Sequence, residues 1–427
     1  MKICVVALGK IGLPLAVQFA SKGHTVIGAD VSEPVVSLVN DGAIPFPGET
    51  DLDLKLKQVV TSGHLKATTD TAAAVAASEA VVVVVPLFVD GDGVPDFAWM
   101  DAATEAIARG LKPGTLVSYE TTLPVGTTRD RWAPMLEQGS GLTCGQDFHL
   151  VFSPERVLTG RVFADLRRYP KLVGGLDQAA TARGLEFYRQ VLDFDERADL
   201  PRPNGVWDMG NAEAAEMAKL AETTYRDVNI GLANQFARFA DTTGIDITTV
   251  IEACNSQPYS HIHSPGIAVG GHCIPVYPRL YLWNDPNASV VRSAREANAA
   301  MPEYAIQLLA DAYGDLTGAE VLVLGASYRG GVKETAFSGV FPTVAALQAR
   351  GAQPYVSDPM YTPDELTALG LPAYTGQPVS AVVVQADHAE YRTLGVKDLP
   401  GVRVVVDGRR VTDPQRWEGV RREVIGG

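Results

Sequence analysis

A cysteine in a turn-rich loop is the residue of this chain whose surroundings most favour covalent chemistry. Cys273 lies in the run Gly270-Gly271-His272-Cys273-Ile274-Pro275, between a flexible pair of glycines and a rigid proline. A thiol in such a loop is often a nucleophile when a nearby cation stabilises the thiolate. The alternative is a buried, inert cysteine. The neighbouring histidines, His261, His263 and His272, fit no standard zinc spacing with Cys273, so we expect no metal.

A turn typical of dinucleotide binding opens the chain. The residues Ala7-Leu8-Gly9-Lys10-Ile11-Gly12 have the GxGxxG spacing, with alanine in place of the first glycine. Gly9 lets the backbone approach a pyrophosphate, and Gly12 permits close packing of helix and sheet. Asp30, eighteen residues after Gly12, ends the second predicted strand, where a carboxylate binds both ribose hydroxyls and repels a 2′-phosphate. We therefore predict NAD at Leu8, Gly9, Lys10, Ile11, Gly12 and Asp30, with Thr122 as a further contact. A turn without a ligand is the alternative, and Ala7 favours it.

A lysine on a long predicted helix is a second candidate. Glu216, Lys219 and Thr223 are spaced by three and four residues, so they share one helix face. Lys219 could hold an oxyanion or accept a proton there. The alternative is a solvated helix lysine.

Other polar residues directly follow predicted strands, at the edge where open sheets bind ligands. They are Thr122 in Thr121-Thr122-Leu123-Pro124, Glu155 with Arg156, and Arg409 with Arg410. Paired arginines suit a diphosphate, because the guanidinium fork matches phosphate oxygens. Surface ion pairs and solvated arginines are the alternatives.

The elements that would carry these residues form two α/β blocks. Short β-branched runs alternate with amphipathic stretches, which predicts parallel sheets with crossover helices. A helical stripe runs through 211–243, after a segment, Pro201–Trp207, that reads as a linker. The predicted strands are Lys2–Ala7, Thr25–Asp30, Ala80–Val85, Leu116–Tyr119 and His149–Phe152, then Glu320–Leu324, Gln353–Ser357, Ala381–Gln385 and Val402–Val406.

Composition narrows the class of protein. The 427 residues are 46% hydrophobic and carry a net charge of −14, as expected for a globular protein with an acidic surface. Such a surface repels phosphate backbones and anionic lipid, so we expect neither nucleic acid nor membrane as a partner. Four scattered cysteines predict no disulfide framework and a cytoplasmic location.

Taken together, these motifs resemble the UDP-glucose/GDP-mannose dehydrogenases, the nucleotide-sugar 6-dehydrogenases. The likeness runs nearly end to end, and the GHCIPV form is most similar to the branch acting on UDP-N-acetylhexosamines. The motifs that carry it are the dinucleotide turn, Glu120-Thr121-Thr122-Leu123-Pro124, Ser153-Pro154-Glu155-Arg156, Ala218-Lys219-Leu220-Ala221-Glu222, Gly270–Pro275 and Val406-Asp407-Gly408-Arg409.

The resemblance implies an α/β fold of two Rossmann-like doubly wound domains joined by a long central helix through which the protein dimerises. We expect an NAD-binding domain over 1–200, a central helical region with the cysteine loop over 201–300, and a domain for the nucleoside-diphosphate sugar over 301–427.

The resemblance also implies a chemistry. Cys273 traps the C6 aldehyde of the sugar as a thiohemiacetal, which is oxidised to a thioester and hydrolysed to a uronate. Lys219 stabilises the oxyanion, while Glu155 and Thr122 assist the hydrolytic water. Other expected substrate contacts are Arg156, Tyr259, Gly270, His272, Arg329 and Arg409.

The chain departs from the family pattern at several positions. Thr223 stands where asparagine is usual and Tyr277 where aspartate is usual, and we expect both to take part in proton handling. Tyr259 and Ser260 replace a loop arginine. The usual DDxR stretch reads Lys333-Glu334-Thr335-Ala336, and Arg329 stands where lysine is common.

Two other functions stay open at this point. A two-electron dehydrogenase of the β-hydroxyacid type also pairs a Rossmann domain with a helix-borne lysine, but it gives Cys273 no role. A catalytically silent protein that binds NAD or a sugar nucleotide is favoured by Thr223 and Tyr277. The nucleotide and sugar are equally open, with UDP-N-acetylhexosamine, UDP-glucose and dTDP-glucose as candidates.

Overall fold

The computed structural model describes residues 1–91 and 93–427, which form two compact units, Met1–Ala221 and Glu222–Gly427. Among the described residues, the first unit contains an eight-stranded sheet in the order β10-β9-β8-β7-β4-β1-β2-β3. These strands are β1 (Lys2–Val6), β2 (Thr25–Ala29), β3 (Leu65–Thr68), β4 (Ala80–Val83), β7 (Leu116–Tyr119), β8 (His149–Phe152), β9 (Lys171–Gly175) and β10 (Val206–Asp208).

The order β3-β2-β1-β4-β7-β8 is that of a doubly wound dinucleotide-binding sheet. Successive residues of β1 point to opposite faces, so Ile3 and Val5 join one buried core while Cys4 and Val6 join another. The helices of this unit are α1 (Gly12–Ser21), α2 (Glu33–Asn40), α3 (Leu52–Thr61), α4 (Thr71–Ala76), α5 (Ala98–Gly110), α6 (Ala133–Ser140), α7 (Val162–Arg168) and α8 (Gln178–Val191), with a π-helix at Thr128–Trp132 and a hairpin of β5 (Phe88–Val89) and β6 (Pro95–Asp96).

Two expectations for this unit were wrong. Strand β9 runs antiparallel to β8, with Val151 opposite Gly175, so the sheet is not wholly parallel. The segment 201–207 is not simply a linker, because Val206 and Trp207 open β10 and pair with β9. The prolines and glycine of this segment predict turns. They do not show that the chain from Val206 onward pairs with the edge of the sheet.

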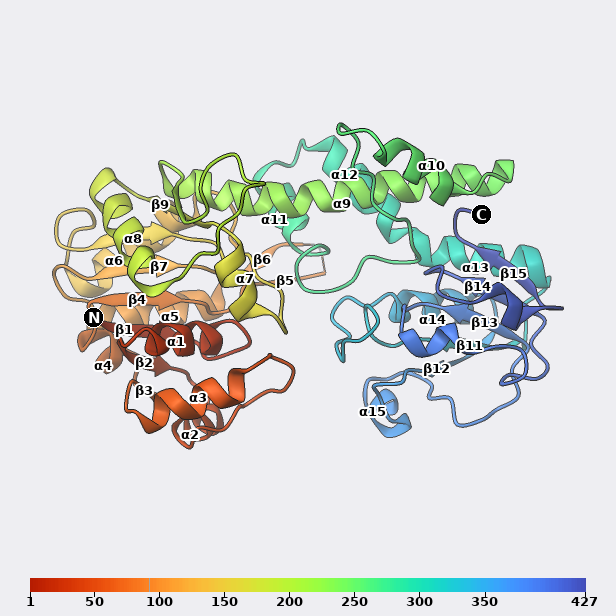
Figure 1. Ribbon diagram of the computed structural model, residues 1–427, viewed down its shortest axis with the longest axis horizontal. Helices are drawn as coiled ribbons and strands as arrows, with labels where there is room; N and C mark the ends of the chain where they lie inside the picture. The colour runs from red at the N-terminus through yellow and green to blue at the C-terminus, as the bar shows by residue number, and fades with distance from the viewer. Residues whose placement is uncertain (92) are drawn as a thin grey trace. The chain divides into compact units, whose positions relative to one another are not determined.

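Helix α9 (Ala212–Thr243) is a single uninterrupted helix of 32 residues, as the stripe predicted, beginning one residue later (Figure 1). Its first residues belong to the first unit and the rest to the second. None of the described helices is long and apolar enough to cross a membrane.

The second unit has its own parallel sheet, in the order β12-β11-β13-β14-β15, the other common doubly wound order. Val321 and Val323 of β11 face one core, and Leu322 and Leu324 face another. The fold class is therefore confirmed. Its elements are α10 (Ile247–Asn255), α11 (Tyr277–Asn284), α12 (Ser289–Ala299), α13 (Met301–Tyr313), β11 (Glu320–Leu324), α14 (Val340–Ala349), β12 (Gln353–Ser357), α15 (Pro363–Ala368), β13 (Ala381–Val384), η2 (Ala389–Arg392), β14 (Val404–Asp407), η3 (Pro414–Trp417) and β15 (Arg421–Val424).

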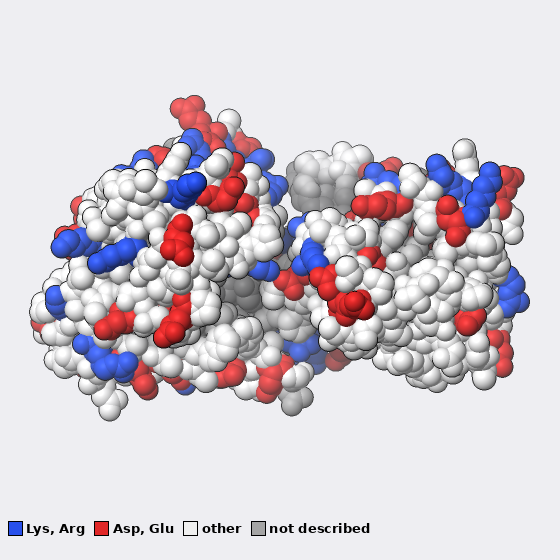
Figure 2. Space-filling view, turned by 90° about the horizontal axis from the view of Figure 1, so that it is seen from below, with Lys and Arg blue, Asp and Glu red and all other residues white. Residues whose placement is uncertain are grey.

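On the face drawn in Figure 2, acidic and basic side chains are interspersed rather than gathered by sign. Ion pairs between exposed side chains also occur, such as that of Arg167 with Asp195 at 2.7 Å. Exposed pairs of this kind contribute little to stability, typically about 0–1 kcal/mol.

Candidate functional site

The turn after β1 is tight and glycine-dependent. Ala7 has a φ of 74°, in the left-handed region that favours glycine, and its N–H donates to the Ala29 carbonyl at 2.8 Å. An alanine in this conformation costs on the order of 1 kcal/mol. A Cβ on Gly12 would lie 1.9 Å from the Ala7 carbonyl oxygen, so the start of α1 tolerates no side chain there.

Gly9 differs, because a Cβ added there would meet no protein atom within 4 Å. The packing of the protein itself therefore does not require glycine at this position. The open space lies at the amino end of α1, whose first N–H groups favour an anion. The turn thus fits the pyrophosphate of a dinucleotide.

Asp30 is fixed beside this turn after β2. One carboxylate oxygen accepts the Leu8 N–H at 2.7 Å, and the other accepts the Ser32 N–H at 2.9 Å. Each oxygen keeps a lone pair for a ribose hydroxyl. The Leu8 side chain is buried and packs against Gly28, so only the backbone of Leu8 faces the turn.

A buried ammonium group links two carboxylates at the carboxyl edge of the same sheet. Lys171 donates to Glu120 at 2.6 Å and to Glu155 at 2.9 Å. Glu120 follows β7, Glu155 follows β8, and Lys171 opens the antiparallel β9, which brings its side chain back to this edge. Glu120 also accepts the Tyr188 hydroxyl at 2.6 Å.

The two carboxylates differ in acidity. Burial raises the pKa of Glu120 to about 7, with Glu155 adding to the rise and Lys171 opposing it. Burial also acts to raise the pKa of Glu155, but the charge and hydrogen bond of Lys171 and the Arg156 N–H outweigh it and lower that pKa. A proton taken up by this cluster therefore resides on Glu120, and Glu155 stays a carboxylate.

The first turns of α9 hold the loop that contains Thr122. The buried carboxylate of Glu216 accepts the Gly126 N–H at 2.6 Å, the Thr128 N–H at 3.0 Å and the Thr128 hydroxyl at 2.6 Å. Thr122 and Lys219 are both buried, at 4% and 7% exposure. A buried lysine on this helix rules out the solvated alternative for Lys219.

In the second unit, the cysteine loop packs on the segment that follows β11. The Gly271 N–H donates to the Ala336 carbonyl at 2.8 Å, and His272 lies 3.4 Å from the Glu334 carboxylate. A Cβ on Gly270 would come within 2.6 Å of the Tyr328 side chain. The partly exposed Cys273 closes this loop, and its carbonyl accepts the N–H of Tyr277 at the start of α11.

Arg409 lies at the carboxyl edge of the second sheet. Its Nε donates to the Gln385 carbonyl at 2.8 Å, and a Cβ on Gly266 would lie 3.0 Å from its Nη1. Burial lowers the pKa of Arg409, and nearby Asp387 and Asp407 oppose that change. Its neighbour Arg410 instead donates to the carbonyls of Gly426 and Gly427, so the two arginines do not form the pair that the sequence suggested.

Comparison with known proteins places the chain in a family. The NAD-binding, central and UDP-binding domains of the UDP-glucose/GDP-mannose dehydrogenase family match residues 1–192, 213–300 and 322–414. The chain belongs to this family. It is thus an NAD-dependent oxidoreductase of the nucleotide-sugar dehydrogenases, and the predicted resemblance is confirmed.

Individual relatives support this assignment. A UDP-N-acetyl-D-mannosamine dehydrogenase of Pyrococcus horikoshii is 34% identical over 96% of both chains. An NDP-N-acetyl-D-galactosaminuronic acid dehydrogenase of Ralstonia solanacearum is 31% identical over 97% of both. The solved structure of the UDP-D-ManNAc dehydrogenase from P. horikoshii matches with a TM-score of 0.88 at 32% identity, covering 100% of this chain and 99% of that one.

Within each unit of this dehydrogenase, many of the predicted site residues lie together. Leu8, Gly9, Lys10, Ile11 and Gly12 form one turn beside Asp30. Gly270 and His272 share the cysteine loop, and Arg329 lies on the segment against which that loop packs, its Nε 3.2 Å from the Tyr328 hydroxyl. Tyr259 is 93% exposed, on a loop that Asn229 holds through the His261 carbonyl and the His263 N–H.

Sequence reasoning did not assign a role to Glu120, Lys171 or Tyr188. Glu120 directly follows a predicted strand, so the edge argument used for Glu155 could have found it. Lys171 opens the buried run 172–175, and a lysine there is a signal of an internal ion pair. Tyr188 carries no such signal.

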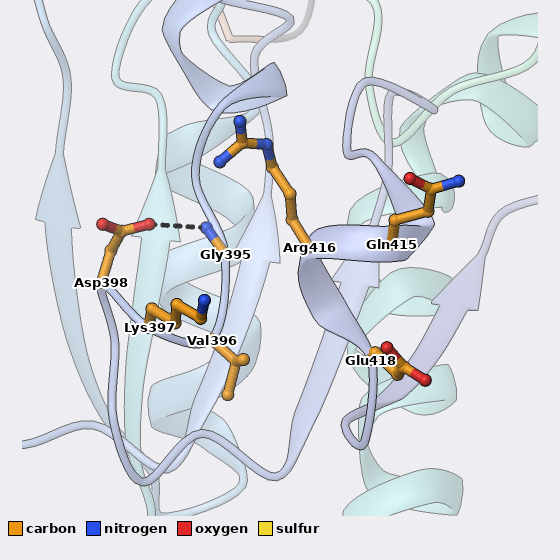
Figure 3. A pocket seen from close by; sticks show the side chains of 7 residues that line it. All are labelled: Gly395, Val396, Lys397, Asp398, Gln415, Arg416 and Glu418. Atoms are coloured by element: carbon orange, nitrogen blue, oxygen red, sulfur yellow. Dashed lines mark hydrogen bonds between the residues drawn. The ribbon is translucent and has the colours of Figure 1, made fainter.

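The hollow shown in Figure 3 does not lie at the edge where open α/β sheets bind their ligands. It has a volume of about 320 Å³ and lies where the chain approaches β14 and β15, at their amino ends. Ligands of open α/β sheets bind at the carboxyl ends. Its lining residues carry both signs of charge: Gly395, Val396, Lys397, Asp398, Gln415, Arg416 and Glu418. Among the residues that the structure describes, no cluster of His, Cys, Asp or Glu could hold a metal ion.

A pair of glycine variants tests the dinucleotide turn. Gly9→Ala should weaken NAD binding at least about tenfold with little change in melting temperature, because the methyl group enters only the open space. Gly12→Ala should lower the free energy of unfolding by about 1–3 kcal/mol, because its methyl group meets backbone. Thermal unfolding measures the effect of each variant on stability, and fluorescence titration with NAD measures its effect on affinity. Unchanged NAD affinity in Gly9→Ala would contradict the assignment.

The Glu120 carboxyl predicts a pH dependence of stability. Its pKa rises from 4.5 in the unfolded chain to about 7 in the fold. Its burial therefore lowers the free energy of unfolding as pH rises through that interval, by on the order of 3 kcal/mol. Glu120→Gln should remove this part of the slope in urea denaturation between pH 4 and 8. Glu303→Gln, at an exposed pair with Arg350, is the control and should keep the wild-type slope.

Proposed function

We propose that the protein oxidises the C6 hydroxymethyl group of a nucleoside-diphosphate hexose to a carboxylate, a four-electron reaction that reduces two NAD per sugar. The observation that carries the proposal is the partly exposed Cys273, in a loop held between Ala336 and the start of α11, in a chain of this family. A two-electron dehydrogenase would not need a thiol there. When bound, NAD supplies the hydride acceptor for both oxidation steps.

In this proposal the thiol keeps the intermediate bound. Attack of the Cys273 thiolate on the C6 aldehyde forms a carbon–sulfur bond, and the resulting thiohemiacetal offers a second C–H bond for oxidation. The thioester that follows is cleaved by water, which releases the thiolate and a uronate. Lys219 stabilises the oxyanions that form on the way, since a buried cation is most effective where charge develops.

Glu155 and Thr122 order the hydrolytic water. The carboxylate of Glu155 is ionised and held by Lys171, so it accepts a hydrogen bond from water in a fixed direction. Glu120 lies next to it with a pKa of about 7, which makes it the better reservoir for the released proton at neutral pH. Thr223 and Tyr277 take the places of the usual asparagine and aspartate, and donate hydrogen bonds rather than accept protons.

The substrate we propose is a UDP-N-acetylhexosamine, since relatives matched over 96% and 100% of this chain are named UDP-N-acetyl-D-mannosamine dehydrogenases. UDP-glucose and dTDP-glucose are the other candidates to assay. We assign the diphosphate to the second sheet edge, at Arg409 and Arg329, with the sugar contacts made by Arg156, Tyr259, Gly270 and His272. The four cysteines form no disulfide, in keeping with the cytoplasmic location we propose.

We also propose a homodimer formed through α9. Four large apolar side chains at helical spacing are exposed on the part of α9 in the second unit: Tyr225 (57%), Leu232 (46%), Phe236 (38%) and Phe239 (63%). Exposed apolar stripes of this kind mark protein interfaces. A second copy of the same helix would cover them by symmetry.

The reaction is tested by its stoichiometry. With a panel of nucleoside-diphosphate hexoses, the enzyme should form two NADH per sugar and a product heavier by 14 Da, the mass change of converting CH2OH to COOH. Cys273→Ser should lose acid formation by at least about 10³-fold, as expected when a nucleophile is removed. Cys254→Ser on α10 is the control and should match the wild type. One NADH per sugar would favour the β-hydroxyacid type, and tight binding without any NADH would favour the silent protein.

The proposed dimer is tested by placing charged side chains on the exposed apolar face of α9. Leu232→Glu combined with Phe239→Glu should give a monomer in sedimentation velocity, because two carboxylates would have to be buried in the contact. Leu54→Glu, an exposed leucine on α3, is the control and should leave the assembly unchanged. A wild-type chain that sediments as a monomer would contradict the proposal.

A further inference from the structure

A row of polar side chains, most of them buried, lies between α9 and α12 in the second unit. Asp227 and Asn234 are seven residues apart on α9, and Arg295 and Asn298 are three apart on α12, so each pair occupies one helix face. Gly231 lies between Asp227 and Asn234 on α9, and a Cβ there would come within 3.0 Å of the Ala294 carbonyl on α12. Glycine there lets the two helices approach closely.

Hydrogen bonds join these four side chains into one ladder. Arg295 donates to Oδ1 of Asp227 at 2.9 Å, and Asn298 donates to the same oxygen at 2.8 Å and to the Asp227 carbonyl at 3.0 Å. Asn234 donates to the Asn298 side-chain oxygen at 2.8 Å. The ladder therefore runs along both helices without a break.

Both ends of the ladder hold the cysteine loop. At one end, the Gly266 N–H donates to Oδ1 of Asn234 at 2.9 Å. At the other end, Nη1 of Arg295 donates to the Ile274 carbonyl at 3.3 Å, directly after Cys273. The segment from 266 to 274 is thus fixed at its beginning and just beyond the thiol.

The buried carboxylate of Asp227 is the member of the ladder whose burial costs free energy. Asp227 is fully buried, and within the described residues its Oδ2 accepts no hydrogen bond. Burial raises the pKa of Asp227 to about 6, while Arg295, Asn298 and the charge of Arg279 oppose the rise. An apolar pair of similar size would often be at least as stable as a buried ion pair. Stability alone therefore does not account for charged groups here.

We propose that Asp227 and Arg295 are positioning residues for the reaction, holding the Ile274 carbonyl and with it the Cys273 thiol in place for the bound sugar. Arg295 makes the contact with the loop, and Asp227 balances and orients its guanidinium group. This inference rests on the proposed function. Asp227 lies four residues after Thr223 and eight after Lys219, on the same face of α9, so one helix would supply both the oxyanion contact and the support for the thiol.

A double-variant experiment separates positioning from stability. Arg295→Met leaves Asp227 buried and unpaired, so its melting temperature should fall, and adding Asp227→Asn should restore much of it. We expect kcat to fall on the order of 10- to 100-fold in both variants, because neither can hold the Ile274 carbonyl. Arg295→Lys should recover part of kcat. KM for NAD should stay within about twofold of the wild type throughout.

If kcat returns together with the melting temperature in the double variant, the ladder is only structural and the proposal is wrong. Arg350→Met, which removes an exposed ion pair with Glu303, is the control and should change neither quantity.

A second measurement needs no turnover. Alkylation of Cys273 by iodoacetamide, followed by mass spectrometry of its peptide, should be several-fold faster in Arg295→Met and in the double variant, because the freed loop exposes the thiol. Equal rates in all variants would overturn the positioning role, even if no sugar proves to be a substrate. Absence of sugar oxidation in the wild type would instead overturn the proposed function.

Discussion

Parallel strands that end at one edge of a sheet are the constraint on which this protein depends. Because β1, β2, β7 and β8 run the same way, the residues that follow them meet at one edge, however far apart they lie in the chain. The dinucleotide turn, Asp30, Glu120 and Glu155 all follow such strands. The antiparallel β9 uses the same edge from the opposite direction, since its first residue, Lys171, lies where β8 ends.

The parts of the fold that depend on local pattern could be predicted well from the sequence. Strands Leu116–Tyr119, His149–Phe152 and Glu320–Leu324 have the predicted bounds, because buried parallel strands read as nearly continuous apolar runs. The more polar Gln353–Ser357 has its predicted bounds as well. The predicted strand over Val402–Val406 instead covers Val404–Asp407, so its bounds are shifted toward the carboxyl end.

The interactions that arrange the candidate site could not be predicted in this way. Lys171 pairs with Glu120 across 51 residues of sequence and with Glu155 across 16, and Asn298 reaches Asp227 across 71. No periodicity links such positions, because the pairs form only after the sheet and helices have packed. Arg410 shows the opposite error: its adjacency to Arg409 suggested a shared ligand, but its left-handed backbone, with φ of 53°, directs it to the chain end.

The hydrogen bond between Gly271 and Ala336 ties the thiol loop to the backbone that follows the first strand of the second sheet. A movement of residues 328–337 must therefore either break that hydrogen bond or shift Gly271, which lies two residues before Cys273. If the diphosphate binds at Arg329 as we propose, a substrate that lacks its nucleotide forgoes a contact on that segment. Such a substrate should react more slowly at C6 as well as bind more weakly. The reason is that the contact to the nucleotide and the position of the Cys273 thiol depend on the same stretch of backbone.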